Sequence, residues 1–292
     1  MSSLRSPCMP EGATRRRLAA TVPSPFVALI TGASSGIGEA TARRLAREPD
    51  TRLVLVARRE QRLQAIAQSV GGATVIAVDL AEPGAPAKVR EVIEAEHGEL
   101  HLLVNNAGAA WRGTFADGGW EVIDRHMKLN FEAPVRLTEA LLPLLRATAA
   151  RQAGDGRKVS IVNIASTAAR VSRPNSGAYS AAKMALAGWS DALCAEEAEQ
   201  GVHVGLVLPG FVKTEGFPAA ELLARPTTRW LVSSPERVAE AIIEAGPGGK
   251  AERYVPRPYF IAAALRLLAP ALVRWALAGG AFTTATGASS RD

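Results

Sequence analysis

The chain has little of what disulfide-rich, metal-binding or nucleic-acid-binding proteins need. Its two cysteines, Cys8 and Cys194, cannot form a disulfide framework and lack the spacing of metal ligands, so we expect both to be reduced. Of the four histidines only His97 and His101 are four residues apart, no third histidine or cysteine is near them, and the sequence predicts no metal site. Aromatic residues are only 5% of the chain, and none lies beside the one basic run, Arg15 to Arg17, to stack on bases. We therefore expect no nucleic-acid partner.

Charge of one sign is not concentrated either. The formal net charge is +6, from 34 Lys and Arg against 28 Asp and Glu, and the basic residues are spread along the chain. Arg15 to Arg17 faintly resemble a twin-arginine export signal, which needs an apolar stretch and a cleavage site after it. The apolar stretch that follows, Phe26–Thr31, leads directly into a glycine motif, so cleavage there would destroy a strand. We reject export and expect a cytoplasmic protein.

Apolar sequence is abundant, because 48% of the residues are hydrophobic, enough for a sizeable core. Short β-branched runs alternate with helix-period segments, which is typical of a parallel sheet covered by helices on both faces. We predict one α/β domain over residues 25–256, with a Rossmann-type doubly wound parallel sheet of about seven strands. The predicted strands are Phe26–Thr31, Arg52–Ala57, Thr74–Val78, Leu102–Asn105, Lys158–Ile164, His203–Leu208 and Arg253–Val255.

Three segments depart from this alternation. Residues 1–24 are expected to form a flexible N-terminal extension. Residues 211–233 carry Gly216, Pro218 and Pro226 and end at Ser233-Ser234, all after a strand end, and are interpreted either as a lid over a ligand site or as an ordinary surface excursion. Residues 257–292 are expected to form an apolar helical extension and tail. Arginines and a proline interrupt the apolar runs of 258–279, which predicts a packed or interfacial helix pair and leaves weak contact with a membrane surface open.

A glycine-rich run, Thr31–Gly38, stands at the end of the first predicted strand and opens a helix near Ile37. Glycines permit a tight turn and let backbone N–H groups approach phosphate oxygens. The spacing is GxxxGxG rather than the GxGxxG of the general dinucleotide fingerprint. A glycine-containing turn alone would be a weak signal.

Two further motifs make the signal specific. Asn105-Asn106-Ala107-Gly108 follows the fourth predicted strand, and Tyr179 and Lys183 form a YxxxK pair on one face of a later helix. With the TGxxxGxG run, they resemble the short-chain dehydrogenase/reductase family over about residues 26–256. The resemblance implies an oxidoreductase that moves a hydride between nicotinamide and a carbonyl or secondary alcohol.

The resemblance also assigns the catalytic roles. Tyr179 would transfer the proton, and Ser166, thirteen residues before it, would donate to the substrate oxygen. Lys183 would lower the pKa of the Tyr179 phenol together with the oxidised nicotinamide, and bond the nicotinamide ribose. Asn130 would hold a water molecule that links Lys183 to a proton relay.

Cofactor preference can be argued from position 58, twenty residues past Gly38 at the end of the second predicted strand. An acidic residue there would accept from a ribose 2′-hydroxyl, whereas Arg58 and Arg59 favour a 2′-phosphate. We therefore predict NADP(H) over NAD(H). Arg59 could instead begin the next helix and face solvent. The predicted cofactor-binding residues are Gly32, Ser34, Ser35, Gly36, Ile37, Gly38, Arg58, Arg59, Asp79, Leu80, Asn106, Ala107, Gly108, Tyr179, Lys183, Pro209, Gly210, Val212 and Thr214.

The substrate is less constrained by the sequence. The candidate substrate-facing residues are apolar, which suits a hydrophobic ketone such as a lipid, steroid or xenobiotic, although each could equally pack in the core: Trp111, Val171, Phe211, Phe217 and Trp230. A non-catalytic NADP-binding sensor or scaffold, and a membrane-peripheral reductase of lipids, remain alternatives. By resemblance, a homodimer or homotetramer is expected through helices near 119–149 and 177–200.

Overall fold

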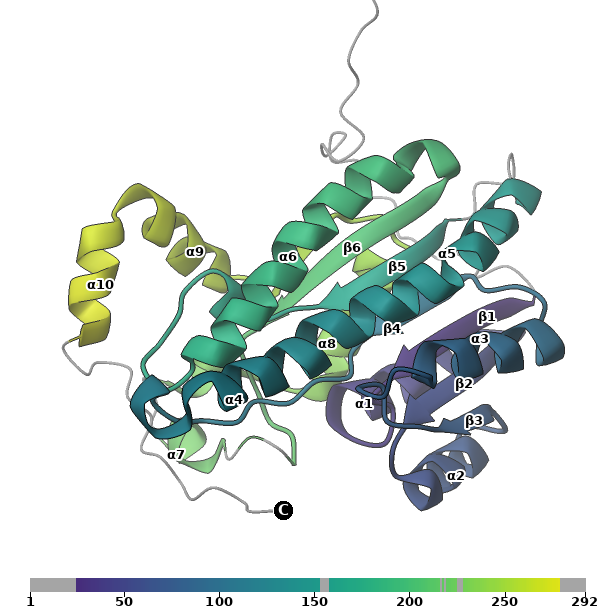
Figure 1. Cartoon of the computed structure of the whole chain (residues 1–292), viewed down its shortest axis with the longest axis horizontal. Coiled ribbons are helices and arrows are strands. Elements are labelled where there is room, and N and C mark those ends of the chain that lie inside the picture. Colours follow the sequence, from purple (N-terminus) through teal and green to yellow (C-terminus); the bar gives the residue numbers. More distant parts are fainter. Residues whose placement is uncertain (1–24, 153–157, 216, 218, 225–227, 279–292) are drawn as a thin grey trace, which may run out of the picture.

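The computed structural model describes residues 25–152, 158–215, 217, 219–224 and 228–278. The predicted extension 1–24, the tail after residue 278 and parts of the predicted lid lie outside this range. Seven strands form one parallel sheet in the order β3-β2-β1-β4-β5-β6-β9 (Figure 1). The strands are β1 (Phe26–Thr31), β2 (Thr51–Ala57), β3 (Thr74–Ala77), β4 (Leu102–Asn105), β5 (Val159–Ile164), β6 (Val202–Pro209) and β9 (Glu252–Val255).

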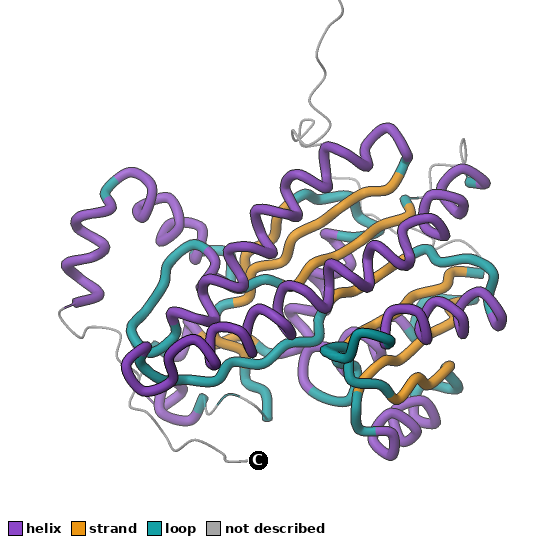
Figure 2. Tube along the Cα trace, viewed as in Figure 1, coloured by secondary structure: helices purple, strands orange, loops and turns teal. Residues whose placement is uncertain are grey.

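Helices cover both faces of this sheet (Figure 2). One face packs against α1 (Gly36–Leu45), α2 (Glu60–Ser69) and α8 (Pro235–Ala245). The other packs against α3 (Ala85–Glu96), α5 (Ala133–Arg151) and α6 (Gly177–Glu197). The predicted doubly wound Rossmann-type sheet is confirmed.

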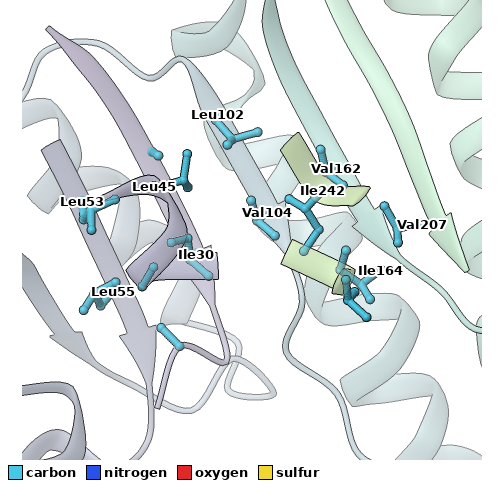
Figure 3. Close-up of a cluster of buried hydrophobic side chains, with 14 of the residues drawn as sticks. Ile30, Leu45, Leu53, Leu55, Leu102, Val104, Val162, Ile164, Val207 and Ile242 are labelled. Atoms are coloured by element: carbon cyan, nitrogen blue, oxygen red, sulfur yellow. The ribbon is translucent and has the colours of Figure 1, made fainter. Parts of the chain in front are cut away.

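The β1 sequence shows why its residues form a central strand. Phe26, Ala28 and Ile30 belong to the core on the α1 and α8 face, whereas Val27 and Leu29 belong to the core on the α5 face. Because successive side chains of a strand alternate, burial on both faces requires an apolar residue at every position. Figure 3 shows the first of these cores, where Leu45 of α1 and Ile242 of α8 meet side chains of the sheet.

Two predicted strands coincide with the observed ones, and the other five differ by one residue at one or both ends. The sequence reading missed a short parallel pair formed by β7 (Phe211–Val212) and β8 (Val232–Ser233). This pair holds together the two ends of the predicted lid, which also contains α7 (Ala220–Ala224) and the 3-10 turn η4 (Arg229–Leu231). Two-residue strands carry no periodicity that a sequence could reveal.

A π-helical turn, η1 (Lys128–Glu132), joins α4 (Phe115–Met127) directly to α5. Such turns widen the helix locally and occur frequently at functional sites. Asn130 lies in this turn, so the residue that was expected on a regular helix stands on a local irregularity.

The C-terminal segment forms two short helices, α9 (Tyr259–Leu268) and α10 (Pro270–Ala278), which extend away from the sheet (Figure 1, yellow). No single helix in the described ranges is long and apolar enough to cross a membrane. Taken together, α9 and α10 are long and apolar enough to cross one, but the pair is bent by 115°.

Cys194 is almost buried on α6. Cys8 lies outside the described residues.

Candidate active site

A cavity of about 450 Å³ opens at the carboxyl ends of the parallel strands. This is the edge where open α/β sheets bind their ligands. All four predicted catalytic residues line it, and so do all predicted cofactor-binding residues except Gly38. Among the described residues, no cluster of three or more His, Cys, Asp or Glu could hold a metal ion.

The glycine turn between β1 and α1 depends on its three glycines. Gly32 and Gly36 have φ of +64° and +57°, a left-handed conformation that strains other residues. Gly38 lies behind the turn rather than in the cavity, and a Cβ there would stand 2.3 Å from the carbonyl oxygen of Gly32. The third glycine therefore permits close packing of helix on turn.

The N-terminus of α1 faces the cavity through Ser35, Gly36 and Ile37. Ser35 is its N-cap residue, and its side chain makes no capping hydrogen bond to the helix. The first N–H groups of a helix have no partner inside it and carry the positive end of the helix dipole. This turn therefore has the donors that a pyrophosphate requires.

The Asn-Ala-Gly segment after β4 is tied to the glycine turn. The Thr31 hydroxyl accepts hydrogen bonds from the backbone N–H groups of Asn106 and Ala107, each at 2.9 Å, and donates to Val104. The Asn106 amide donates to the Thr31 carbonyl at 2.8 Å. One threonine thus fixes the relative position of two motifs that lie more than seventy residues apart.

Asn105 does not line the cavity but belongs to a buried network of hydrogen bonds. Its amide group donates to Asn163 at 2.8 Å and to Thr138 at 3.0 Å, and the Asn163 amide donates to Ser190. All four side chains are buried. This polar chain connects β4, β5, α5 and α6, and holds the strand ends that carry the site.

Arg59 and Arg58 take different positions beside the glycine turn. The Arg59 guanidinium donates to the hydroxyls of Ser34 at 3.1 Å and Ser35 at 2.8 Å. Arg58 has a side chain that is 75% exposed and stands 3.7 Å from the Asp79 carboxylate. The alternative that Arg59 simply faces solvent is not what the structure shows, because this guanidinium and two hydroxyls converge at one rim of the cavity.

Glu215 adds a contact that the sequence did not reveal. Its carboxylate pairs with Arg62 at 2.7 Å and with Arg59 at 3.5 Å. Both arginines hold the pKa of Glu215 below its usual value, with the Arg62 hydrogen bond as the main cause. The loop after β7 is thereby connected to the start of α2 across the cavity rim.

Tyr179 and Ser166 meet inside the cavity through a hydrogen bond between their side chains. Burial raises the pKa of Tyr179, while the Ser166 hydrogen bond and the positive charge of Arg173 oppose that rise. Arg173 is a cation near the phenol that the sequence did not mark.

Lys183 is 3% exposed, and its ammonium donates to the Ile164 carbonyl at 2.8 Å. Burial lowers the pKa of Lys183 to about 7, because a desolvated cation is disfavoured. This side chain is therefore close to its titration point at neutral pH in the protein alone.

Asn130 is fully buried, and its amide donates to the carbonyls of Ala109 at 3.0 Å and His126 at 3.2 Å. Its Oδ1 has no hydrogen-bond partner among the described residues. A Cβ on Gly108 would stand 2.7 Å from this oxygen and 3.4 Å from Lys183 Nζ. The glycine therefore leaves open the one place where the Asn130 acceptor and the Lys183 donor meet.

His126 positions an aromatic wall beside Tyr179. Its Nε2 accepts from the Trp111 backbone N–H at 3.1 Å, and its Nδ1 lies 2.7 Å from the Val122 carbonyl, so Nδ1 carries the proton. Burial lowers the pKa of His126, which favours this neutral form. Its ring packs edge-on against Trp111 and Tyr179, with centroids 5.0 and 6.1 Å away.

Three of the five candidate substrate-facing residues line the cavity, namely Trp111, Phe211 and Phe217. The rings of Phe211 and Phe217 are stacked, with centroids 5.2 Å apart. Val171 and Trp230 do not line it, and Trp230 is 56% exposed. Arg112 and Arg173 line it as well, and no motif in the sequence marked either of them.

Comparison with known proteins identifies the family. The model of the short chain dehydrogenase family matches residues 26–221, which is most of the described sheet and its helices. The chain belongs to the short-chain dehydrogenase/reductase family of oxidoreductases.

Two similar relatives are both named dehydrogenase/reductase SDR family member 7B. The protein from Bos taurus is 32% identical over 263 residues, which cover 84% of this chain and 78% of the relative. The protein from Danio rerio is 33% identical over 198 residues, covering 64% of this chain and only 61% of the relative. The chain thus spans less than two thirds of that second protein.

Solved structures with the same fold include two reductases. L-sorbose reductase from Gluconobacter frateurii, complexed with NADPH and L-sorbose, has a TM-score of 0.69 and 28% identity, covering 80% of this chain and 95% of that one. A 3-ketoacyl-(acyl-carrier-protein) reductase from Brucella melitensis, complexed with NADH, has a TM-score of 0.70 and 27% identity, covering 79% and 96%. Proteins with this fold are thus known in complex with NADPH and in complex with NADH.

Proposed function

We propose that this chain is an NADP(H)-dependent oxidoreductase that interconverts a carbonyl group and a secondary alcohol on a hydrophobic substrate. The observation that carries the proposal is the convergence of Ser166, Tyr179, Lys183 and Asn130 in the same cavity as the glycine turn. Each of these side chains has hydrogen bonds or burial that fix it in place. The donor set fits a dinucleotide, because the α1 N-terminus has no side-chain cap and faces the cavity.

Tyr179 and Ser166 would act on the substrate oxygen. A substrate carbonyl that receives hydrogen bonds from both hydroxyls is polarised, and Tyr179 gives it the proton in reduction or takes it in oxidation. Ser166 Oγ is held at this place, since it accepts from the Ala168 N–H and lies 3.3 Å from the Pro209 carbonyl, and its single O–H would turn from that carbonyl to the substrate oxygen. When bound, the nicotinamide supplies or accepts the hydride.

Lys183 and Asn130 would return the proton to Tyr179 from solvent. Lys183, with a pKa of about 7, can both give and take a proton at neutral pH. The Asn130 Oδ1 offers a buried acceptor close to Lys183 Nζ, suited to orient a bridging water.

Selection of NADP(H) rests on positive charge at the rim of the glycine turn. Arg59 with Ser34 and Ser35 forms a group of donors that suits a 2′-phosphate, and Arg58 adds a second, exposed guanidinium. Neither β2 nor the turn that follows it presents a carboxylate for a ribose 2′-hydroxyl. The NADPH complex of the similar sorbose reductase supports this choice.

A fluorescence titration of the full chain with NADPH and NADH tests the cofactor site first, on wild type and Arg58→Asp. We expect tighter binding of NADPH, with a preference that weakens or inverts in the variant. A panel of ketones then tests turnover. Binding of NADPH without oxidation by any carbonyl would support a non-catalytic sensor, whereas no binding of either cofactor would contradict the enzyme itself.

A second proposal concerns α9 and α10, which we propose lie against an anionic lipid surface. Leu267, Leu268 and Trp275 are 81%, 83% and 75% exposed. Residues 256–278 contain three arginines and no acidic residue, so the apolar pair carries only positive charge. Burial of apolar side chains at the interface, together with attraction between arginine and lipid phosphate, would favour this contact.

Co-sedimentation with phosphatidylcholine vesicles, with and without phosphatidylglycerol, tests the lipid contact. We expect binding to the anionic vesicles that Leu268→Ser with Trp275→Ser reduces, whereas Leu223→Ser on α7 does not. Equal sedimentation of all variants would contradict it. Loss of self-association in the double variant, without any vesicle binding, would show instead that a second copy covers these helices.

Assembly as a homodimer or homotetramer through α4, α5 and α6 is also proposed. Phe115 and Trp120 on α4 and Met184 on α6 are exposed apolar side chains on neighbouring helices. Such a surface favours association, because burial in a partner removes it from water. Light scattering on wild type and Trp120→Ser would show a shift toward monomer.

A further inference from the structure

Two arginines that line the cavity, Arg112 and Arg173, and a third that does not, Arg125, each lie over an aromatic ring. Arg112 stands 5.2 Å from the Phe217 centroid, Arg173 4.6 Å from Phe211, and Arg125 3.9 Å from Trp111. The three rings line the cavity, as do Arg112 and Arg173, and the same wall contains Tyr179. Positive charge is therefore concentrated where the substrate must lie.

These three arginines have no acidic partner among the residues that the structure describes. The two acidic residues of the cavity, Asp79 and Glu215, lie beside the cofactor rim and pair with Arg58, Arg59 and Arg62. Arg112 and Arg173 thus have no described carboxylate beside them, whereas the three arginines at the cofactor rim share two carboxylates.

Arg173 shows most clearly that the positive charge is unfavourably placed in the protein alone. Burial and the neighbouring charge of Arg112 both lower the pKa of Arg173, with burial as the main cause. An arginine nevertheless keeps its charge in proteins, so this guanidinium remains a partly desolvated cation beside a second one. A desolvated charge is costly unless a group of opposite charge approaches it.

The aromatic rings hold the guanidinium groups without satisfying them. A ring face attracts the plane of the guanidinium and leaves its N–H edge free to donate. Two such edges at one cavity wall match the oxygens of a carboxylate or a phosphate, which arginine binds with paired hydrogen bonds. The stacked rings of Phe211 and Phe217 offer apolar surface next to them.

We propose that the substrate is an anionic oxo compound, whose carboxylate or phosphate binds Arg173 and Arg112 while its carbonyl meets Tyr179 and Ser166. This inference rests on the proposed function and specifies its substrate class. The cofactor's own phosphates do not explain the pair, because the donors proposed for them are at the α1 N-terminus and on Arg58 and Arg59, on other segments of the chain.

Matched substrates test the inference with NADPH as reductant. One arm compares 5-oxohexanoate and 7-oxooctanoate with their methyl esters, and a second compares 4-hydroxybutan-2-one with its phosphate. We expect kcat/KM for the anion to exceed that for the neutral partner by about tenfold or more, the effect of one charge-assisted hydrogen bond. The two arms show whether the site takes a carboxylate or a phosphate.

Variants attribute the preference to the arginines. Arg173→Gln and Arg112→Gln should reduce the ratio of anion to neutral substrate toward one. Arg170→Gln is the matched control, because Arg170 pairs with Glu252 at 2.9 Å and does not line the cavity. Thermal unfolding of each variant excludes misfolding as the cause.

Failure of the inference can be separated from failure of the proposed function. Equal use of anion and neutral partner, or an anion preference that Arg173→Gln keeps, overturns the inference and leaves the reductase intact. If no carbonyl is reduced, the proposed function fails, and calorimetry with octanoate against methyl octanoate still decides the anion site. If octanoate binds and Arg173→Gln weakens that binding, the anion site is supported. If the acid and the ester bind equally, the anion site is overturned.

Discussion

The guanidinium of Arg59 donates a 2.8 Å hydrogen bond to the hydroxyl of Ser35, which stands at the N-cap position of α1. A charged group from the turn after β2 is thereby held beside the N–H groups of α1, which have no side-chain cap. The sites that we propose for a 2′-phosphate and for a pyrophosphate thus share one small surface.

Arg59→Gln should reduce the ratio of NADPH to NADH affinity by about tenfold or more, because a charge-assisted hydrogen bond contributes about 1.5–3 kcal/mol. Titration of cofactor fluorescence measures both dissociation constants. Arg62→Gln is the control, since Arg62 pairs with Glu215 and does not touch the serines. If both variants behaved alike, the Arg59 contact would not select the phosphate.

Tyr179→Phe should lower kcat by about 10² to 10⁴, the usual contribution of a positioned general acid, without unfolding the protein. Tyr254→Phe on β9 removes the same hydroxyl group at a position outside the cavity, and this variant should retain the wild-type rate. Steady-state assays with NADPH and a reducible ketone measure kcat for both variants. Full activity of the Tyr179→Phe variant would assign proton transfer to another group.

The rates of oxidation and of reduction should depend differently on pH. Burial raises the pKa of Tyr179, so the phenol stays protonated across the neutral range and can donate in reduction. Oxidation needs the deprotonated phenol. The kcat/KM for oxidation should therefore rise with pH, whereas the kcat/KM for reduction should stay nearly constant. Rates in both directions between pH 6 and 9 test this, and the opposite slopes would contradict it.

Gly108→Ala should reduce activity strongly, because the added Cβ would stand 2.7 Å from the Asn130 oxygen and 3.4 Å from Lys183 Nζ. Gly113→Ala, only five residues further, would meet nothing within 4 Å and should leave activity unchanged. Steady-state kinetics with unfolding temperatures separate the loss of catalysis from loss of the fold. Equal activity of both variants would show that Asn130 and Lys183 do not need this space.

Lys183 makes stability depend on pH in a defined direction. Its pKa is lowered from 10.5 to about 7, so between these values the unfolded chain holds a proton that the folded protein lacks. The free energy of unfolding should therefore rise with pH above 7, by up to about 1.4 kcal/mol per pH unit. Below pH 7 both states are charged and this contribution is constant.

Lys183→Met removes this dependence and should be more stable than wild type at pH 7, with a difference that shrinks toward pH 9. Urea unfolding of the protein without cofactor at pH 7, 8 and 9 measures it. Parallel curves for the two proteins would mean that the buried ammonium titrates normally.

Much of the fold could be read from the sequence, because both faces of each central strand are buried and leave a continuous apolar run. Val27 to Ile30 show this directly, as their side chains alternate between the two cores. The motifs Thr31–Gly38 and Tyr179 with Lys183 were equally legible, because backbone and helix geometry dictate their spacing. The short strands β7 and β8 were not, since two residues carry no pattern.

The catalytic and cofactor residues were named from sequence, but their interactions were not. Nothing local shows that Arg59 reaches Ser34 and Ser35, or that Glu215, more than 150 residues away, pairs with it. Nor does anything local show that Arg173 lies close enough to lower the pKa of Tyr179, because that depends on distance in the folded chain.

The sequence by itself determined the sheet, its order of elements and the chemical types of the site residues, because hydrophobic alternation, glycine turns and i to i+4 spacing are local properties of a chain. Only the tertiary structure decided where charge goes unbalanced. Arg112, Arg125 and Arg173 come from three separate segments, and their lack of acidic partners among the described residues became visible once the fold placed Arg112 and Arg173 at the cavity and Arg125 over Trp111. Electrostatic interactions depend on distance and desolvation, and neither is written in the order of residues.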